Sequence, residues 1–71
     1  MGKHASGKER YRILEIFRLA PFVAATVDCT YVDTAVYTAK AFRRYIKEEP
    51  EKFAGIRVHK KGRTVILEKE L

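Results

Sequence analysis

The residues best placed to do chemistry in this chain are cations, grouped in two stretches in its C-terminal half. Between residues 40 and 63 nine lysines and arginines stand against three acids, which cluster around Pro50. A dense group of cations attracts polyanions through its long-range field and through the release of condensed counterions. This pattern predicts a surface that binds nucleic acid.

Two groups of residues are candidates for that contact. The first occupies one arc of a predicted helix, with a tyrosine at its edge that can stack on a base, and the second surrounds a predicted hairpin. The candidates are Tyr37, Lys40, Arg43, Arg44, Lys47, Arg57, His59, Lys60, Lys61 and Arg63. The alternative interpretations are a solvated helix face with internal ion pairs, and a charged hairpin tip that prevents aggregation through the strand edge.

Catalysis and metal binding are not expected. Cys29 is the single cysteine, so no internal disulfide forms, and with His4 and His59 it gives three soft ligands scattered along the chain. The sequence has no nucleophile triad, no glycine loop that cradles phosphate and no metal-ligand spacing. We expect no enzyme activity, no cofactor and no metal.

The chain has 71 residues and a formal net charge of +6, which predicts one domain over residues 8–71 after a flexible basic tail, residues 1–7. Its longest uncharged run, residues 19–27, is short of the ~20 residues of a membrane span, and its start lacks the apolar core of a signal peptide. We expect no membrane partner and a cytoplasmic location, in the host cell if the protein is viral.

A first helix is expected to begin at the capping box formed by Ser6 and Glu9 and to end before Pro21. Its apolar stripe consists of Ile13, Leu14, Ile16, Phe17 and Ala20. A second helix is expected from about Thr34 to Glu49, with Asp33 or Thr34 as its N-cap. The apolar stripe of this second helix consists of Ala35, Ala39, Phe42 and Ile46.

A β-hairpin is expected over residues 56–69, with Lys61 and Gly62 near its tip. If these two residues form the loop, Val58 faces Val65 on the buried side and Ile56 faces Leu67. Two candidate contacts then point outward, and three lie at the tip in any register. The outward pair is Arg57 and His59, and the tip residues are Lys60, Lys61 and Arg63.

Residues 22–32 allow two interpretations. As a strand, Val23, Ala25 and Val27 alternate with polar residues, and the β-branched content favours this state. As a helix, Pro21 suits the first helical position, and Val23 and Val27 share one face. Periodicity alone does not decide between them.

The order of these elements resembles a helix-turn-helix domain with a C-terminal wing. On that resemblance Val23–Ala25 lies in the pre-turn helix, residues 36–45 form the recognition helix in the major groove, and the hairpin touches the flanking backbone. Residues 44–54 also resemble the end of the helix-turn-helix in phage terminase small subunits. The expected fold is therefore a small α+β domain of winged helix-turn-helix type. The alternative is an α-β-α-β-β fold, in which residues 23–31 add a third strand to an antiparallel sheet.

The function expected from these features is binding of double-stranded DNA, as a transcription regulator or as a packaging or architectural factor. A homodimer fits such a domain, because its sites are usually palindromic and a small core gains from a partner. Two other functions stay open. One is an RNA-binding or ribosome-associated protein, and the other is a phage-type inhibitor or adaptor that binds a protein through the hairpin edge and residues 19–23.

Overall fold

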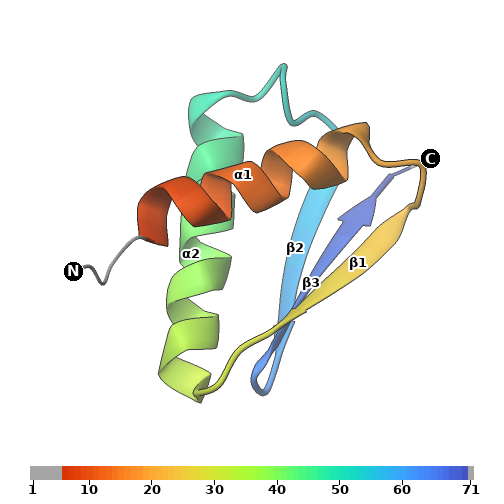
Figure 1. Cartoon of the computed structure of the whole chain (residues 1–71). Coiled ribbons are helices and arrows are strands. Elements are labelled where there is room, and N and C mark those ends of the chain that lie inside the picture. Colours follow the sequence, from red (N-terminus) through yellow and green to blue (C-terminus); the bar gives the residue numbers. More distant parts are fainter. Residues whose placement is uncertain (1–5, 71) are drawn as a thin grey trace.

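A computed structural model describes residues 6–70 of the chain, and the side chains of residues 9–70. Two helices and three strands follow one another in the order α-β-α-β-β (Figure 1). The elements are α1 (Ser6–Leu19), β1 (Ala24–Asp28), α2 (Val32–Glu48), β2 (Ile56–Lys61) and β3 (Thr64–Lys69). The predicted tail falls largely outside the described residues, and its last two, Ser6 and Gly7, belong to α1.

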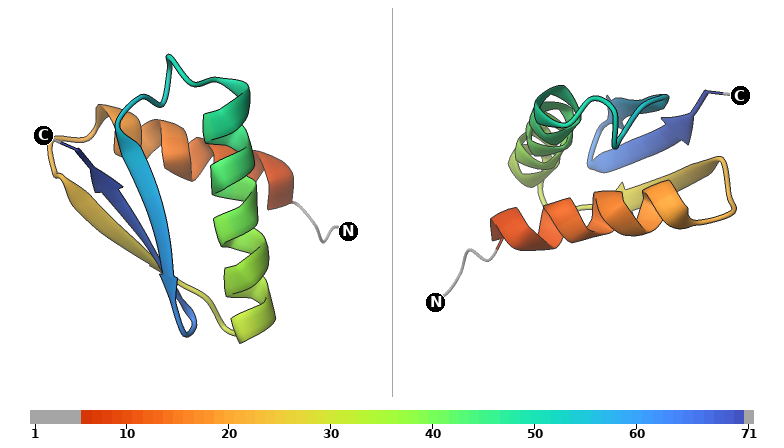
Figure 2. Two further views of the ribbon diagram at one scale, coloured as in Figure 1. Left: turned by 180° about the vertical axis from the view of Figure 1, so that it is seen from behind. Right: turned by 90° about the horizontal axis from the view of Figure 1, so that it is seen from above.

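The three strands form one antiparallel sheet in the order β1-β3-β2, so β3 is central and β1 and β2 are its edges. The two helices cross each other on one side of this sheet (Figure 2). Side chains on the other side are exposed or half-buried, which leaves that face of the sheet open. The chain is thus a two-layer α+β domain.

Residues 24–28 form a strand, which confirms the three-stranded alternative. The expected pre-turn helix over Val23–Ala25 is wrong. Ala25 and Val27 pack against the core while Ala24, Thr26 and Asp28 are exposed, the alternation of a half-buried strand. The local pattern of this segment suits both a helix and a strand, and its pairing with β3 determines that it forms a strand.

The first helix begins at Ser6 and ends just before Pro21, as predicted. Leu14 and Phe17 of its stripe are buried. Ile16 is 61% exposed, so its place in the expected stripe is wrong. Ile16 follows Leu14 by two residues, about 200° around the helix, so it lies on the side of α1 that faces away from the core.

The second helix begins two residues before the expected start, after an N-cap at Tyr31 that makes no side-chain capping bond. Asp33 lies in the first turn of the helix, where its charge is favoured by the helix dipole. Ala35, Ala39 and Phe42 are buried as expected, and Ile46 is half-buried. Neither expected N-cap residue therefore serves as the cap, but the apolar face is correct.

The hairpin turns at Gly62 and Arg63, and Gly62 has φ +62°. Only the first central residue of this turn has a positive φ, as in a type II′ turn. Val58 faces Leu67 and Lys60 faces Val65, so the expected register is wrong by two residues. A shift of two keeps every side chain on its predicted face.

The core lies between the helices and the sheet. Its buried hydrophobic residues are Leu14, Phe17, Ala35, Ala39, Phe42, Tyr45, Phe53, Ile56, Val65 and Leu67. Phe53, in the link from α2 to β2, fills a place that the sequence patterns did not predict. In the part of the chain described here, no helix has the length and apolar character needed to cross a membrane.

Candidate nucleic-acid interface

Helix α2 brings four of the candidate cations onto one exposed face. Its buried stripe holds Ala35, Ala39 and Phe42, and the side chains half a turn away point to solvent. These exposed cations are Lys40, Arg43, Arg44 and Lys47. The amphipathic pattern that attaches α2 to the sheet therefore also turns its cations outward.

Arg43 extends this face toward the sheet. Its Nη2 donates a hydrogen bond to the carbonyl oxygen of Val58 at 3.2 Å, on the edge strand β2. Lys60 follows Val58 on the helix-facing side of β2 and is exposed, at the end of the hairpin that lies level with the start of α2 (Figure 1). We call Lys40, Arg43, Arg44, Lys47 and Lys60 together the basic face.

The charge of the basic face is barely compensated. Its one carboxylate contact among residues 9–70 joins Arg44 Nε to Glu48 Oε2 at 4.0 Å, with both side chains about 60% exposed. Exposed pairs of this kind contribute little, roughly 0–1 kcal/mol. Among the side chains that the structure describes, Lys60 Nζ contacts no carboxylate and donates to the Gly62 carbonyl oxygen at 3.4 Å. Nearly the full positive charge of this face is therefore available to an anionic partner.

On the open face of the sheet two basic side chains lie close to acidic ones. Arg57 Nε lies 2.8 Å from Glu70 Oε2, and His59 Nε2 lies 2.8 Å from Glu68 Oε1. Arg57 and His59 are predicted contacts, but they point away from the helices and from the basic face. The structure therefore divides the predicted residues between two faces.

The hairpin tip joins these two faces. Lys61 is exposed on the open side of the sheet, and Arg63 occupies the turn, where its Nη1 lies 3.5 Å from the carbonyl oxygen of Thr30. Lys60 is exposed on the helix-facing side. The tip thus gathers three cations, as the sequence predicts.

Tyr37 lies on the exposed side of α2, next to Lys40, and is 69% exposed. A shallow hollow beside it is lined by Arg10, Tyr37, Lys40, Ala41, Arg44 and Tyr45. Arg10 comes from α1 and was not predicted. Its place in the stripe of Leu14 and Phe17, four and seven residues later, was the signal that this cation faces α2.

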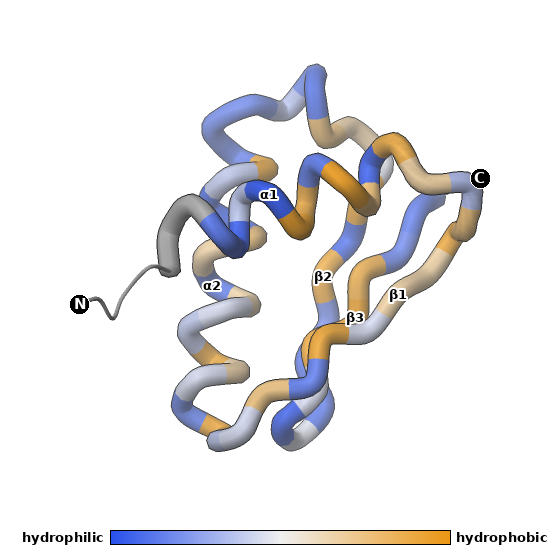
Figure 3. Tube along the Cα trace, viewed as in Figure 1, coloured by the Kyte–Doolittle hydropathy of each residue, from blue (hydrophilic) through white to orange (hydrophobic). Residues whose placement is uncertain are grey.

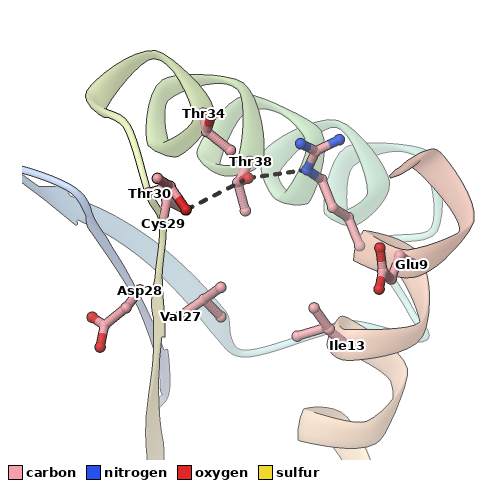
Figure 4. Close-up of a pocket in the computed structure, with 9 residues that line it drawn as sticks. Glu9, Ile13, Val27, Asp28, Cys29, Thr30, Thr34 and Thr38 are labelled. Carbon is pink, nitrogen blue, oxygen red and sulfur yellow. Dashed lines mark hydrogen bonds between the residues drawn. The ribbon is translucent and has the colours of Figure 1, made fainter. Parts of the chain in front are cut away.

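A second hollow lies where α1, the end of β1 and the start of α2 meet (Figure 4). Thr38, a buried polar residue, accepts a hydrogen bond from Arg10 Nε at 3.0 Å, and Cys29 Sγ lies 4.0 Å from the same hydroxyl. Asp28 points away from the hollow and accepts a bond from Thr64 at 2.9 Å. Residues 6–70 hold no cluster of histidine, cysteine and acidic side chains that suits a metal ion. These contacts join α1 to α2 and β1.

Lys52 is a cation used inside the fold. Its Nζ donates hydrogen bonds to Glu15 Oε2 at 2.7 Å and to the Tyr11 hydroxyl at 2.8 Å, and Tyr11 donates in turn to Glu49 Oε2 at 2.6 Å. The bond to Glu15, then that to Tyr11, raises the pKa of Lys52 above its ordinary value. This cluster ties the α2–β2 link to α1.

Comparison with protein-family models, with curated proteins and with solved structures gives no match to this chain. The resemblance to winged helix-turn-helix domains and to terminase small subunits therefore stays a prediction from the sequence.

Proposed function

We propose that this protein binds double-stranded DNA through the basic face. The observation that carries the proposal is the contrast in pairing. Cations on the basic face have one weak carboxylate contact among the described residues, whereas Arg57 and His59 on the open sheet face each have a close one. Cations without nearby acids can neutralise the phosphates of DNA, which releases the counterions condensed on the DNA.

The shape of α2 supports a duplex as the polyanion. The helix has 17 residues, a length of about 25 Å, and its cations share one exposed side. The major groove of DNA, about 12 Å wide, admits a helix presented in this way. Tyr37 and Lys40 then face base edges or phosphates, and Arg43 and Lys47 reach the backbone.

The hairpin tip supplies a second contact in this proposal. Lys60, Lys61 and Arg63 grip the phosphate backbone beside the groove that holds α2. This docking keeps the recognition helix and the wing of the winged helix-turn-helix prediction. It has no pre-turn helix, since Ala24 and Ala25 belong to β1 and Val23 precedes that strand. By occupying DNA in the cytoplasm, of a host cell if the protein is viral, such a protein acts as a regulator or a packaging factor.

Fluorescence anisotropy with a labelled random duplex, at two salt concentrations, tests this proposal. A random single-stranded RNA of matched length is the comparison. We expect tight binding to the duplex that weakens steeply as salt rises, with weaker binding to RNA. Tighter binding to RNA than to the duplex would indicate that the basic face binds RNA rather than double-stranded DNA. Absence of binding to both at low salt would overturn the proposal.

A further inference from the structure

The two edges of the sheet differ in how their backbone groups are used. Antiparallel strands exchange hydrogen bonds through alternate residue pairs. The Lys69 N–H donates to the Val23 carbonyl at 2.8 Å, so odd-numbered residues of this segment bond to β3. The Cys29 N–H, which donates to the Arg63 carbonyl at 2.8 Å, confirms this alternation. The residues whose N–H and C=O groups point away from the sheet are Ala24, Thr26 and Asp28.

The outward groups of β2 are partly covered. The Ile56 N–H donates to the Phe53 carbonyl at 3.2 Å, and the Val58 carbonyl accepts from Arg43. Lys60 adds a charge to the same edge. Bonds and charges of this kind prevent a strand edge from pairing with another chain.

The β1 edge has no such protection. Within residues 6–70 no hydrogen bond uses the outward backbone groups of Ala24, Thr26 or Asp28, and all three residues are exposed. The strand carries one charge, on Asp28. An uncovered and nearly uncharged edge is a template for a further strand.

Exposed apolar side chains lie at both ends of β1. Phe22 and Val23 precede the strand and are 57% and 47% exposed. Tyr31 and Val32 follow it and are 68% and 50% exposed. Figure 3 shows the first of these apolar stretches where α1 ends and β1 begins. A partner that covers both stretches must itself present apolar groups at both ends of its contact.

We propose that β1 pairs with β1 of a second copy of this chain, antiparallel and about a two-fold axis at Thr26. In this register Thr26 faces Thr26, and Ala24 of each copy faces Asp28 of the other, so no like charges meet. The apolar start of one strand then lies beside the apolar end of the other. Such self-complementarity is the requirement for a symmetric dimer.

The charge distribution favours a second copy of the chain as the partner at the β1 edge. The basic face lies along α2 and β2, whereas β1 is the opposite edge of the sheet. Two copies joined at β1 therefore keep most of their positive charges apart. The dimer contains one six-stranded sheet with a β2 strand at each edge, so both basic faces remain exposed. The dimer does not depend on the proposed function, because β1 lies outside the basic face.

A charge-swap experiment tests the register. Thr26→Lys and Thr26→Glu change an exposed side chain, so both variants should fold. We expect the wild type to be a dimer by light scattering coupled to size exclusion, each variant alone to be a monomer, and an equimolar mixture of the two to form a heterodimer. A wild type that stays monomeric at millimolar concentration would overturn the proposal, as would homodimers of both variants or a mixture that stays monomeric.

A matched pair of proline variants tests the edge itself. Thr26→Pro and Lys60→Pro each remove an N–H that points away from the sheet, so the ladders to β3 are retained. We expect Thr26→Pro to be a monomer and Lys60→Pro to remain a dimer. The reverse pattern would place the interface at β2 and overturn the proposal. If circular dichroism shows that either proline variant is unfolded, the charge-swap mixture decides.

Discussion

The basic face and the open face of the sheet both carry exposed basic side chains, but the two faces differ in how close acidic side chains lie to them. On the open face Arg57 and His59 each have a carboxylate oxygen at 2.8 Å. On the basic face the single carboxylate contact found within residues 9–70 is the 4.0 Å pair of Arg44 and Glu48. The number of cations therefore says less about a binding surface than their distance from the chain's own acids.

Phe42→Ala should have the largest effect, because it removes the support of the basic face. Phe42 is fully buried between α2 and the sheet. Loss of a buried phenylalanine costs about 3–5 kcal/mol, enough to unfold a domain with so small a core. Urea denaturation measures this change. Ile16→Ala, at a site that is 61% exposed, is the control and should change the free energy of unfolding by less than about 0.5 kcal/mol. Equal effects of the two variants would show that the helix faces are assigned wrongly.

Reversal of charge at the hairpin tip should have the next largest effect. We expect Lys60→Glu, Lys61→Glu and Arg63→Glu together to abolish DNA binding without unfolding the domain, because all three side chains are exposed. Anisotropy gives the affinity, and circular dichroism checks the fold. An unchanged affinity for DNA would show that the hairpin tip does not contact the DNA.

Replacing Arg57 and His59, the paired basic side chains of the open face, should change DNA binding little. Arg57→Gln with His59→Gln leaves the basic face intact and breaks two internal pairs. We expect the affinity for duplex DNA to stay within about two-fold of the wild type, since each of these side chains already has a carboxylate oxygen at 2.8 Å. A ten-fold loss of affinity would show that pairing on the open face does not remove a cation from the interface.

The smallest effect is expected at Lys52. Lys52→Met removes the bonds to Glu15 and Tyr11, so it should lower the midpoint of thermal unfolding and leave DNA affinity unchanged. The pKa of Lys52 is raised in the folded state. Protonated Lys52 therefore stabilises the fold fully at pH values below its unfolded pKa, about 10.4, and this contribution falls as the pH rises through the folded pKa. Since pH 9 is still roughly 1.4 units below that unfolded pKa, the difference in unfolding midpoint between wild type and variant should be constant from pH 6 to pH 9. A difference that disappears by pH 9 would contradict this assignment.

Periodicity predicted both helices and the hairpin, because each has an amphipathic pattern and because proline marks the helix ends and glycine the turn. It left residues 22–32 open, because only the pairing of β1 with β3 distinguishes their two states. The outward arc of cations on α2 followed from the helical repeat. Their pairing did not, since Arg57 meets Glu70 and His59 meets Glu68 across strands whose register depends on where the hairpin turns. Arg43 and Val58, which are 15 residues apart, meet only through tertiary packing.

The most direct test of the central claim is the salt dependence of duplex binding for two sets of charge-removal variants. One set is Lys40→Gln, Arg43→Gln and Lys47→Gln on the basic face, and the other is Arg57→Gln and His59→Gln on the open face. Each lost phosphate contact lowers the slope of log affinity against log salt by about 0.9. We predict a slope reduced by about 2.7 in the first set and unchanged in the second. Equal changes in both sets, or no change in the first, would contradict the account.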